Sequence, residues 1–221
     1  MKIALIDYGA GNLHSAGKAL TRALDEIGVT GHVVLGANPD EVAEADRIVL
    51  PGDGAYRDCR EHLAEVDGLE EVLQEQVRVK GRPFLGICVG MQLLSEVGEE
   101  RGETKGLGWI PGRVVALDPK SPTLASRHLK VPHMGWNTLR KTGDHPVLDG
   151  LPFGEDGLHA YFLHSYHLLP SDPADLLATA DYGGSVSAIV GRDTVIGTQF
   201  HPEKSQKLGI ALLANFLRWA P

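Results

Sequence analysis

The sequence predicts an α/β domain in three layers, with a mainly parallel central sheet and a β-rich second half. Apolar strands alternate with amphipathic helices in the first half of the chain, which is typical of a parallel sheet. Short β-rich segments with turn signals fill residues 106–199, and an amphipathic helix closes the chain. With 221 residues and 43% apolar content, one core is expected, so residues 1–221 should form a single domain.

Strands are expected in the first half at residues 2–7, 32–35, 47–50 and 83–88, and helices should follow the first, third and fourth of them. The first helix has its apolar residues at helical spacing, and Gly28 stands where a C-terminal cap belongs. This stripe predicts a core-facing helix and consists of Leu13, Gly17, Leu20, Leu24 and Ile27.

In the second half, Gly183-Gly184 is a turn signal. A hairpin should follow, with strands at 186–190 and 194–198 joined by a turn at 191–193. This hairpin leads directly into His201. The final helix presents one apolar face made of Leu208, Leu212, Phe216 and Trp219.

The composition excludes several classes of protein. A net charge of −8 and a pI near 5.6, without a run of lysine or arginine, argue against a nucleic-acid or anionic-membrane surface. Two cysteines, Cys59 and Cys88, give no disulfide framework, and Asp7 interrupts the first apolar run before a signal-peptide core or membrane span can form. We therefore expect a cytoplasmic location, with small molecules and proteins as partners.

Cys88 is the candidate nucleophile. It lies where an apolar strand meets a Gly-x-Cys-x-Gly turn, formed with Gly86 and Gly90, and a helical pattern follows. This is the form of a nucleophile elbow, in which small residues permit a tight bend at the head of a sheet. Exposure at the turn, the positive end of the next helix and a nearby imidazolium would all favour the thiolate. On this pattern alone, a buried structural cysteine remains the alternative.

His201 and Glu203 form the second candidate element, in a His-Pro-Glu sequence just before the last helix. Pro202 favours extended geometry for His201, so the imidazole and the carboxylate can project to one side. A surface turn is the alternative for this motif by itself. Together with Cys88, however, the motif supplies a nucleophile, a base and a group that orients the base.

These motifs resemble the class I (triad) glutamine amidotransferases, and the resemblance covers essentially the whole chain. It is closest to one branch, the glutaminase subunits of imidazole glycerol phosphate synthases. Three further motifs carry this narrower resemblance, namely Ile6-Asp7-Tyr8-Gly9-Ala10-Gly11-Asn12-Leu13, Pro132-His133-Met134-Gly135-Trp136-Asn137 and Tyr161-Phe162-Leu163-His164-Ser165-Tyr166.

The resemblance implies a flavodoxin-like fold and hydrolysis of L-glutamine to glutamate and ammonia through a Cys88 thioester. It also implies a heterodimer with a (β/α)₈ cyclase subunit, which uses the ammonia to form imidazole glycerol phosphate and aminoimidazole carboxamide ribotide in histidine biosynthesis. No cofactor is implied. Two rivals remain at this point, a glutaminase that feeds another synthase and a catalytically silent binding module of the same fold.

Pro51-Gly52-Asp53-Gly54 is the candidate oxyanion loop, because by chain order it can lie beside the elbow. Attack by Cys88 creates negative charge on oxygen, so we expect donors from the Val89 amide and from Gly52 and Asp53. A plain turn is the alternative. Asp53 departs from the family, which usually has an apolar residue there, and we expect its carboxylate to point outward and bond a nearby backbone N–H.

The resemblance also assigns substrate-binding and interface residues. The glutamine-binding residues would be Gly54, Gln92, Ser165 and Tyr166. The contacts with the cyclase would be made by Asn12, Trp136, Tyr161 and Lys204. For Trp136 and Tyr161 the alternative is ordinary packing, and for Lys204 it is a solvated charge.

Two other patterns predict no ligand. Gly9-Ala10-Gly11-Asn12 lacks the third glycine of a dinucleotide loop, so a tight strand-to-helix turn is the better interpretation. The histidines of the second half lack metal-binding spacing, so no metal site is expected.

Overall fold

The computed structural model describes residues 1–118 and 128–221. Its main sheet has eight strands in the order β2-β1-β3-β4-β14-β13-β12-β9. β2, β1, β3, β4 and β14 are parallel, and the remaining neighbours are antiparallel. The parallel half has the flavodoxin-like order, as predicted. The strands of this sheet are β1 (Lys2–Ile6), β2 (His32–Gly36), β3 (Arg47–Leu50), β4 (Phe84–Ile87), β9 (Arg140–Lys141), β12 (Leu176–Asp181), β13 (Ser185–Arg192) and β14 (Val195–Thr198).

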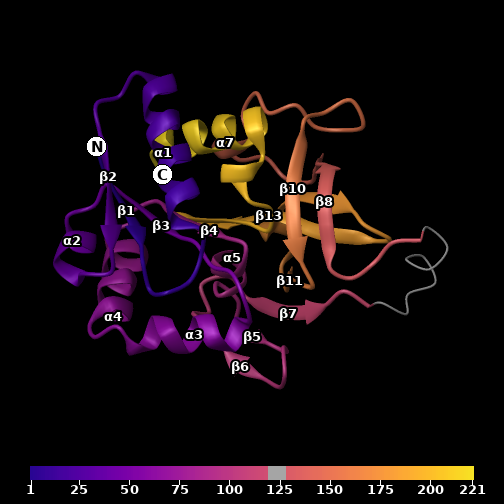
Figure 1. Ribbon diagram of the computed structural model, residues 1–221, viewed down its shortest axis with the longest axis horizontal. Helices are drawn as coiled ribbons and strands as arrows, with labels where there is room; N and C mark the ends of the chain where they lie inside the picture. The colour runs from indigo at the N-terminus through magenta and orange to yellow at the C-terminus, as the bar shows by residue number, and fades with distance from the viewer. Residues whose placement is uncertain (119–127) are drawn as a thin grey trace.

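Helices cover both faces of this sheet, which gives the three predicted layers. α1 and α7 pack together on one side, and α3 and α4 lie on the other (Figure 1). The helices are α1 (Leu13–Ile27), α2 (Pro39–Ala43), α3 (Tyr56–Glu65), α4 (Leu69–Leu73), α5 (Val89–Gln92) and α7 (Gln206–Arg218). A π-helical segment, Gln74–Val79, extends α4, and short 3₁₀ turns lie at Pro146–Leu148, Pro173–Asp175 and Pro202–Lys204.

Two smaller sheets complete the β-rich second half. One is the antiparallel pair β8 and β10, which stand side by side in Figure 1. The other has the order β11-β7-β5-β6. Their strands are β5 (Val97–Gly98), β6 (Thr104–Lys105), β7 (Gly112–Ala116), β8 (His133–Thr138), β10 (His159–His164) and β11 (Tyr166–Pro170).

Local sequence explains most element boundaries. Gly28 ends α1 in the left-handed conformation (φ 66°), and the Asn12 side chain caps the start of that helix. The hairpin of β13 and β14 is confirmed, but its turn lies at Asp193 and Thr194, later than predicted, because β13 continues through Arg192. Trp219 follows α7 as its C-cap and does not form part of the helix.

The core follows the parallel strands, whose central members are almost completely buried. Because β1, β3, β4 and β14 run parallel, the loops that follow them meet at one edge of the sheet. Ligands of open α/β sheets bind at this carboxyl edge. In the described residues, no helix is long and apolar enough to cross a membrane.

Candidate functional site

Cys88 lies on a strained turn directly after β4. Its φ is +55°, a conformation that non-glycine residues rarely adopt. A Cβ on Gly86 would come within 2.5 Å of the Gly90 carbonyl oxygen, and one on Gly90 would overlap the Leu50 carbonyl. The bend therefore requires small residues on both sides, as the elbow motif predicted. The helix that follows is shorter than expected: α5 has four residues, so its dipole contributes less to the thiolate than a long helix would.

Cys88 is only 4% exposed, so the expected exposure at the turn was wrong; two polar groups lie at hydrogen-bonding distance from its sulfur. The Leu163 carbonyl oxygen lies 3.8 Å from Sγ, and Nε2 of Gln199 also lies 3.8 Å from it. The carbonyl can accept from the neutral thiol, whereas the amide N–H can donate to the thiolate.

The side chains of His201 and Glu203 lie together, as the His-Pro-Glu motif predicts. The Nδ1 atom of His201 and Oε1 of Glu203 are 2.8 Å apart, and both side chains are buried. His201 is extended, but Glu203 lies in the 3₁₀ turn Pro202–Lys204, so the pairing arises from a turn and not from a continuous strand. Because Nδ1 holds the carboxylate, Nε2 is left for proton transfer.

The pKa of His201 is raised to about 10 by opposing causes. Burial lowers it, but hydrogen bonding and charge from Cys88 and Glu203 outweigh burial and raise it. The neighbouring His164 shows the opposite behaviour, since burial is the main cause that lowers its pKa to about 3. A charged His201 is thus favoured when Cys88 is a thiolate.

The loop after β3 contacts the elbow. The Val89 N–H donates to the Gly52 carbonyl oxygen at 3.3 Å. A Cβ on Gly52 would lie 2.7 Å from the Gly90 nitrogen and 2.8 Å from the Tyr8 hydroxyl, so glycine is required at this close approach. In this conformation the loop turns a carbonyl toward the elbow, where an oxyanion site needs N–H groups.

The Asp53 carboxylate is held by the loop after β1. Its Oδ1 accepts a hydrogen bond from the backbone N–H of Gly11 at 3.0 Å, which agrees with the prediction for this side chain. The Asp53 carbonyl oxygen accepts from the Cys59 thiol at 3.1 Å, and the Tyr8 hydroxyl donates to the Pro51 carbonyl at 2.8 Å. Burial raises the pKa of the Cys59 thiol to about 11, so Cys59 stays neutral at this contact.

One cleft of about 310 Å³ brings most of the predicted residues together. Cys88 and His201 line it from β4 and the segment after β14, and Val89 and Gln92 line it from α5. Gly52 and Glu203 are not among the lining residues. The other predicted residues in the lining are Asn12, Asp53, Gly54, Ser165, Tyr166 and Lys204.

Trp136 and Tyr161 lie outside the cleft, on neighbouring strands β8 and β10. Their rings are edge to face at 5.5 Å, and Nζ of Lys204 lies 5.7 Å from the centre of the Tyr161 ring. Lys204 also lines the cleft. The three predicted interface residues outside the first loop therefore form one group at the rim of the site.

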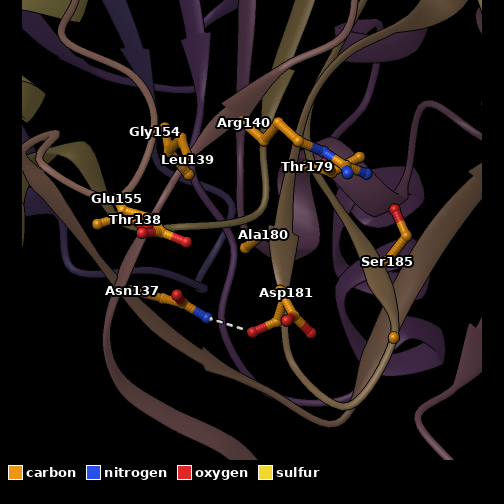
Figure 2. A pocket seen from close by; sticks show the side chains of 11 residues that line it. Asn137, Thr138, Leu139, Arg140, Gly154, Glu155, Thr179, Ala180, Asp181 and Ser185 are labelled. Atoms are coloured by element: carbon orange, nitrogen blue, oxygen red, sulfur yellow. Dashed lines mark hydrogen bonds between the residues drawn. The ribbon is translucent and has the colours of Figure 1, made fainter.

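A larger cavity, of about 580 Å³, lies beside β8, β9 and β12 (Figure 2). Asn137 points across it toward Asp181, and its Nδ2 donates to the Asp181 carbonyl oxygen at 2.9 Å. Neither a cysteine nor a histidine is among the residues that line it. The smaller cleft, which holds the nucleophile and the base, is therefore the better candidate for chemistry.

Sequence reasoning missed Gln199, Leu163, Tyr8 and Cys59 as neighbours of the site. Gln199 could have been found, because residues two apart in an extended segment share a face and Gln199 precedes His201 by two. The other contacts come from chain segments distant in sequence. In the part of the chain that the structure describes, no group of three or more metal-ligating side chains is arranged to hold an ion.

Comparison with known proteins gives a consistent result. The family model for glutamine amidotransferase class-I matches residues 4–219. The imidazole glycerol phosphate synthase subunit HisH of Rhizobium meliloti is 57% identical over 221 residues, which is 100% of both chains. The HisH subunit of Agrobacterium fabrum is 55% identical, again over 100% of both chains.

A solved structure shows the same fold at low identity. The glutaminase domain of Trypanosoma brucei CTPS with bound acivicin has a TM-score of 0.64 and 13% sequence identity to this chain. The match covers 100% of this chain and 95% of that one.

Proposed function

This chain belongs to the class-I glutamine amidotransferases, and from that premise we propose that it is the glutaminase subunit of an imidazole glycerol phosphate synthase. It hydrolyses L-glutamine to glutamate and ammonia, and the ammonia passes to a cyclase subunit for histidine biosynthesis. The observation that carries this proposal is the shared cleft in which Cys88 stands on its elbow and His201 is oriented by Glu203 at 2.8 Å.

The reaction begins with transfer of the Cys88 thiol proton to Nε2 of His201. The sulfur then attacks the side-chain carbonyl carbon of glutamine, and a negative charge forms on the carbonyl oxygen. His201 returns the proton as the C–N bond breaks, which releases ammonia and leaves a thioester on Cys88. A water molecule, deprotonated by His201, attacks the thioester and releases glutamate and the free thiol.

The oxyanion needs the loop after β3 to change conformation. In the described conformation the Val89 N–H already donates to the Gly52 carbonyl. Rotation of the peptide between Gly52 and Asp53 would remove that carbonyl and direct the Asp53 N–H toward the oxyanion, so that Val89 and Asp53 both donate. We propose that the resting site is slow for this reason, and that the partner favours the rotated loop.

Glutamine would occupy the cleft, with its side-chain amide at Cys88. Gln92 lines it from α5 and Gly54 from the loop after β3, while Ser165 contributes from the link between β10 and β11 and Tyr166 from the start of β11. A cleft of about 310 Å³ is at the lower end of the range for small-molecule sites and suits a single amino acid.

The cyclase would bind the exposed face of β8 and β10. Met134 is 65% exposed, Trp136 49% and Leu163 39%, which is unusual for large apolar side chains on a monomer. Met134 pairs with Leu163 and Trp136 with Tyr161 across the two strands. Because the Leu163 carbonyl lies 3.8 Å from the Cys88 sulfur, this face adjoins the place where ammonia forms.

The same face is connected to the catalytic histidine. The backbone N–H of His201 donates to the backbone carbonyl oxygen of Tyr161 at 3.0 Å. Ser205 joins the two segments as well, because its hydroxyl donates to the His201 carbonyl at 2.6 Å and accepts from the Tyr161 N–H at 2.9 Å. A partner seated on β10 could therefore influence the position of His201 directly.

We also propose a cytoplasmic location and a single domain over residues 1–221. Both cysteines are free, which suits a reducing compartment. One cluster of buried apolar residues extends from β1 to α7, which supports a single cooperative unit.

The test of the proposed function is the rate of ammonia release from glutamine, measured with the chain alone and with the cyclase carrying its nucleotide substrate. We expect slow release alone and at least about tenfold faster release in the complex, as for an allosteric coupling of 1–3 kcal/mol. In the assembled synthase, added ammonia should bypass Cys88→Ala. A rate that neither the cyclase nor its ligand changes, or failure of the bypass, would contradict the assignment.

A further inference from the structure

Gln199 is a buried side chain whose polar end reaches the nucleophile. It follows β14, two residues before His201, and is 0% exposed. Its Nε2 lies 3.8 Å from Sγ of Cys88. An amide buried in this way must satisfy both its donor and its acceptor atoms, so its orientation can be worked out from its neighbours.

The orientation is determined by an acceptor at the far end of a short chain of hydrogen bonds. The Tyr166 carbonyl oxygen can only accept, and it lies 2.9 Å from Nε2 of Gln92. Nε2 of Gln92 therefore faces Tyr166, and its second proton is directed to Oε1 of Gln199 at 3.1 Å. With its oxygen toward Gln92, Gln199 turns its amino group toward Cys88.

The reverse orientation would place two NH₂ groups against each other between Gln92 and Gln199. The Tyr166 carbonyl also faces Nδ1 of His164 at 2.9 Å, so that nitrogen must donate as well. A flipped Gln92 would place its amide oxygen against the Tyr166 carbonyl oxygen, and neither of these atoms can donate, so that orientation is excluded. The hydrogen-bond network therefore has one direction. At one end the Cys88 sulfur accepts a hydrogen bond from Gln199, and at the other end the Tyr166 carbonyl accepts hydrogen bonds from Gln92 and His164.

A buried thiolate needs a hydrogen-bond donor such as the Gln199 amide, because water does not solvate its charge. Cys88 is 4% exposed, and its other neutral neighbour, the Leu163 carbonyl, can stabilise only the protonated thiol. When the S–H bond breaks and the proton moves to His201, the electron pair stays on sulfur. A donor aimed at the sulfur stabilises that charge, as hydrogen bonds to a charged group generally do.

We propose that Gln199 is a further catalytic residue, whose Nε2–H donates to Cys88 and stabilises the attacking thiolate. Gln92 would hold Gln199 in this orientation in addition to lining the glutamine cleft. The catalytic role of Gln199 rests on the proposed glutaminase function. Its effect on the acidity of the Cys88 thiol does not, and can be measured without glutamine.

The experiment is the pH dependence of Cys88 alkylation by iodoacetamide, followed by mass spectrometry of the Cys88 peptide. It uses the full chain without glutamine or partner. Gln199→Met has a similar length and no N–H, and we expect its alkylation curve to move to higher pH by about one unit, with reaction about tenfold slower on the acidic limb and an unchanged alkaline plateau. Gln199→Glu, which adds a carboxylate beside the sulfur, should move the curve at least as far.

Thr198→Val is the matched control. Thr198 is also 0% exposed and adjoins Gln199, and within the described chain its hydroxyl has no hydrogen-bond partner. Its curve should coincide with that of the wild type. If Gln199→Met does not fold, as judged by thermal unfolding, Gln199→Leu, which likewise has no N–H and adds no charge, takes its place.

Either of two results would overturn the proposal. One is a curve for the Gln199 variants that coincides with the wild type. The other is a rate lowered equally at every pH, plateau included, which would indicate a structural role only. Ammonia release by the wild type with its cyclase tests the proposed function separately, so failure of one inference is distinguishable from failure of the other.

Discussion

The Val89 N–H and the Gly52 carbonyl oxygen form a hydrogen bond of 3.3 Å beside the nucleophile. An oxyanion at Cys88 would need this N–H, so the Gly52 carbonyl competes with the transition state for the same donor. The side chain of the next residue, Asp53, accepts a hydrogen bond from the Gly11 N–H at 3.0 Å. These two contacts together stabilise the resting conformation of the loop.

Asp53→Val should therefore raise glutamine hydrolysis by the chain alone more than it changes the rate of the partner-activated complex. Loss of a hydrogen bond of about 1 kcal/mol favours the rotated loop about fivefold in the resting state, while the activated state already has it. Parallel steady-state assays measure both rates. Asp53→Asn keeps an acceptor for Gly11 and is the control; an equal fold-change in both states, or none in either, would remove Asp53 from the switch.

His201→Ala should lower kcat for glutamine hydrolysis almost as much as Cys88→Ala, by about 10³-fold or more, because it removes the group that transfers the proton. Glu203→Gln should cost at least about tenfold less, because it can still bond Nδ1 of His201 and loses mainly its charge. Initial rates of the assembled synthase measure all three variants. A His201 variant as active as the wild type would contradict the triad.

Trp136→Ala should weaken binding of the cyclase about 30-fold, as expected for loss of an aromatic side chain worth about 2 kcal/mol at the centre of an interface. Val79→Ala is the control, because Val79 is 69% exposed and lies in the π-helical segment after α4. Titration calorimetry gives both dissociation constants. Equal affinities for the two variants would exclude the face of β8 and β10 as the contact.

Acidification should destabilise the fold below pH 6.5 because buried histidines must stay neutral. Burial lowers the pKa of His133 and of His167 to about 4, from 6.5. Between these values the unfolded chain binds protons that the folded chain does not, so stability falls as pH falls, by up to about 1.4 kcal/mol per pH unit for each histidine. His201, with its raised pKa, is charged in both states below pH 6.5 and adds nothing to this slope.

His167→Gln offers the check. His167 is 7% exposed, and among the described residues its Nδ1 has no partner. The variant should lose about 1 kcal/mol less stability per pH unit than the wild type between pH 6 and pH 5. Urea unfolding at the two pH values gives the slopes. Identical slopes would show that His167 becomes protonated in the folded protein.

The sequence predicted those parts of the fold that depend on local pattern. Strand β4 and the elbow at Cys88 follow from an apolar run beside small residues, and Gly28 marks the end of α1 by its capping role. The pairing of His201 with Glu203 was also predicted, although the local geometry is a 3₁₀ turn.

The direction of individual peptides could not be predicted in this way. That the Gly52 carbonyl faces Val89 depends on contacts from Tyr8 and Cys59, which approach the loop from other elements. The orientation of the Gln199 side-chain amide depends on the Tyr166 carbonyl, which is more than thirty residues away in the chain. Such long-range hydrogen bonds leave no periodic signal in the sequence.

We propose that Cys88 is the nucleophile that forms a covalent intermediate with glutamine. The most direct test is mass spectrometry of the peptides after reaction with an electrophile that mimics glutamine. We expect one label, on the peptide that contains Cys88. Excess glutamine should prevent it and Cys88→Ala should abolish it, while Cys59→Ala should leave it unchanged. A label on Cys59 that spares Cys88 would contradict it.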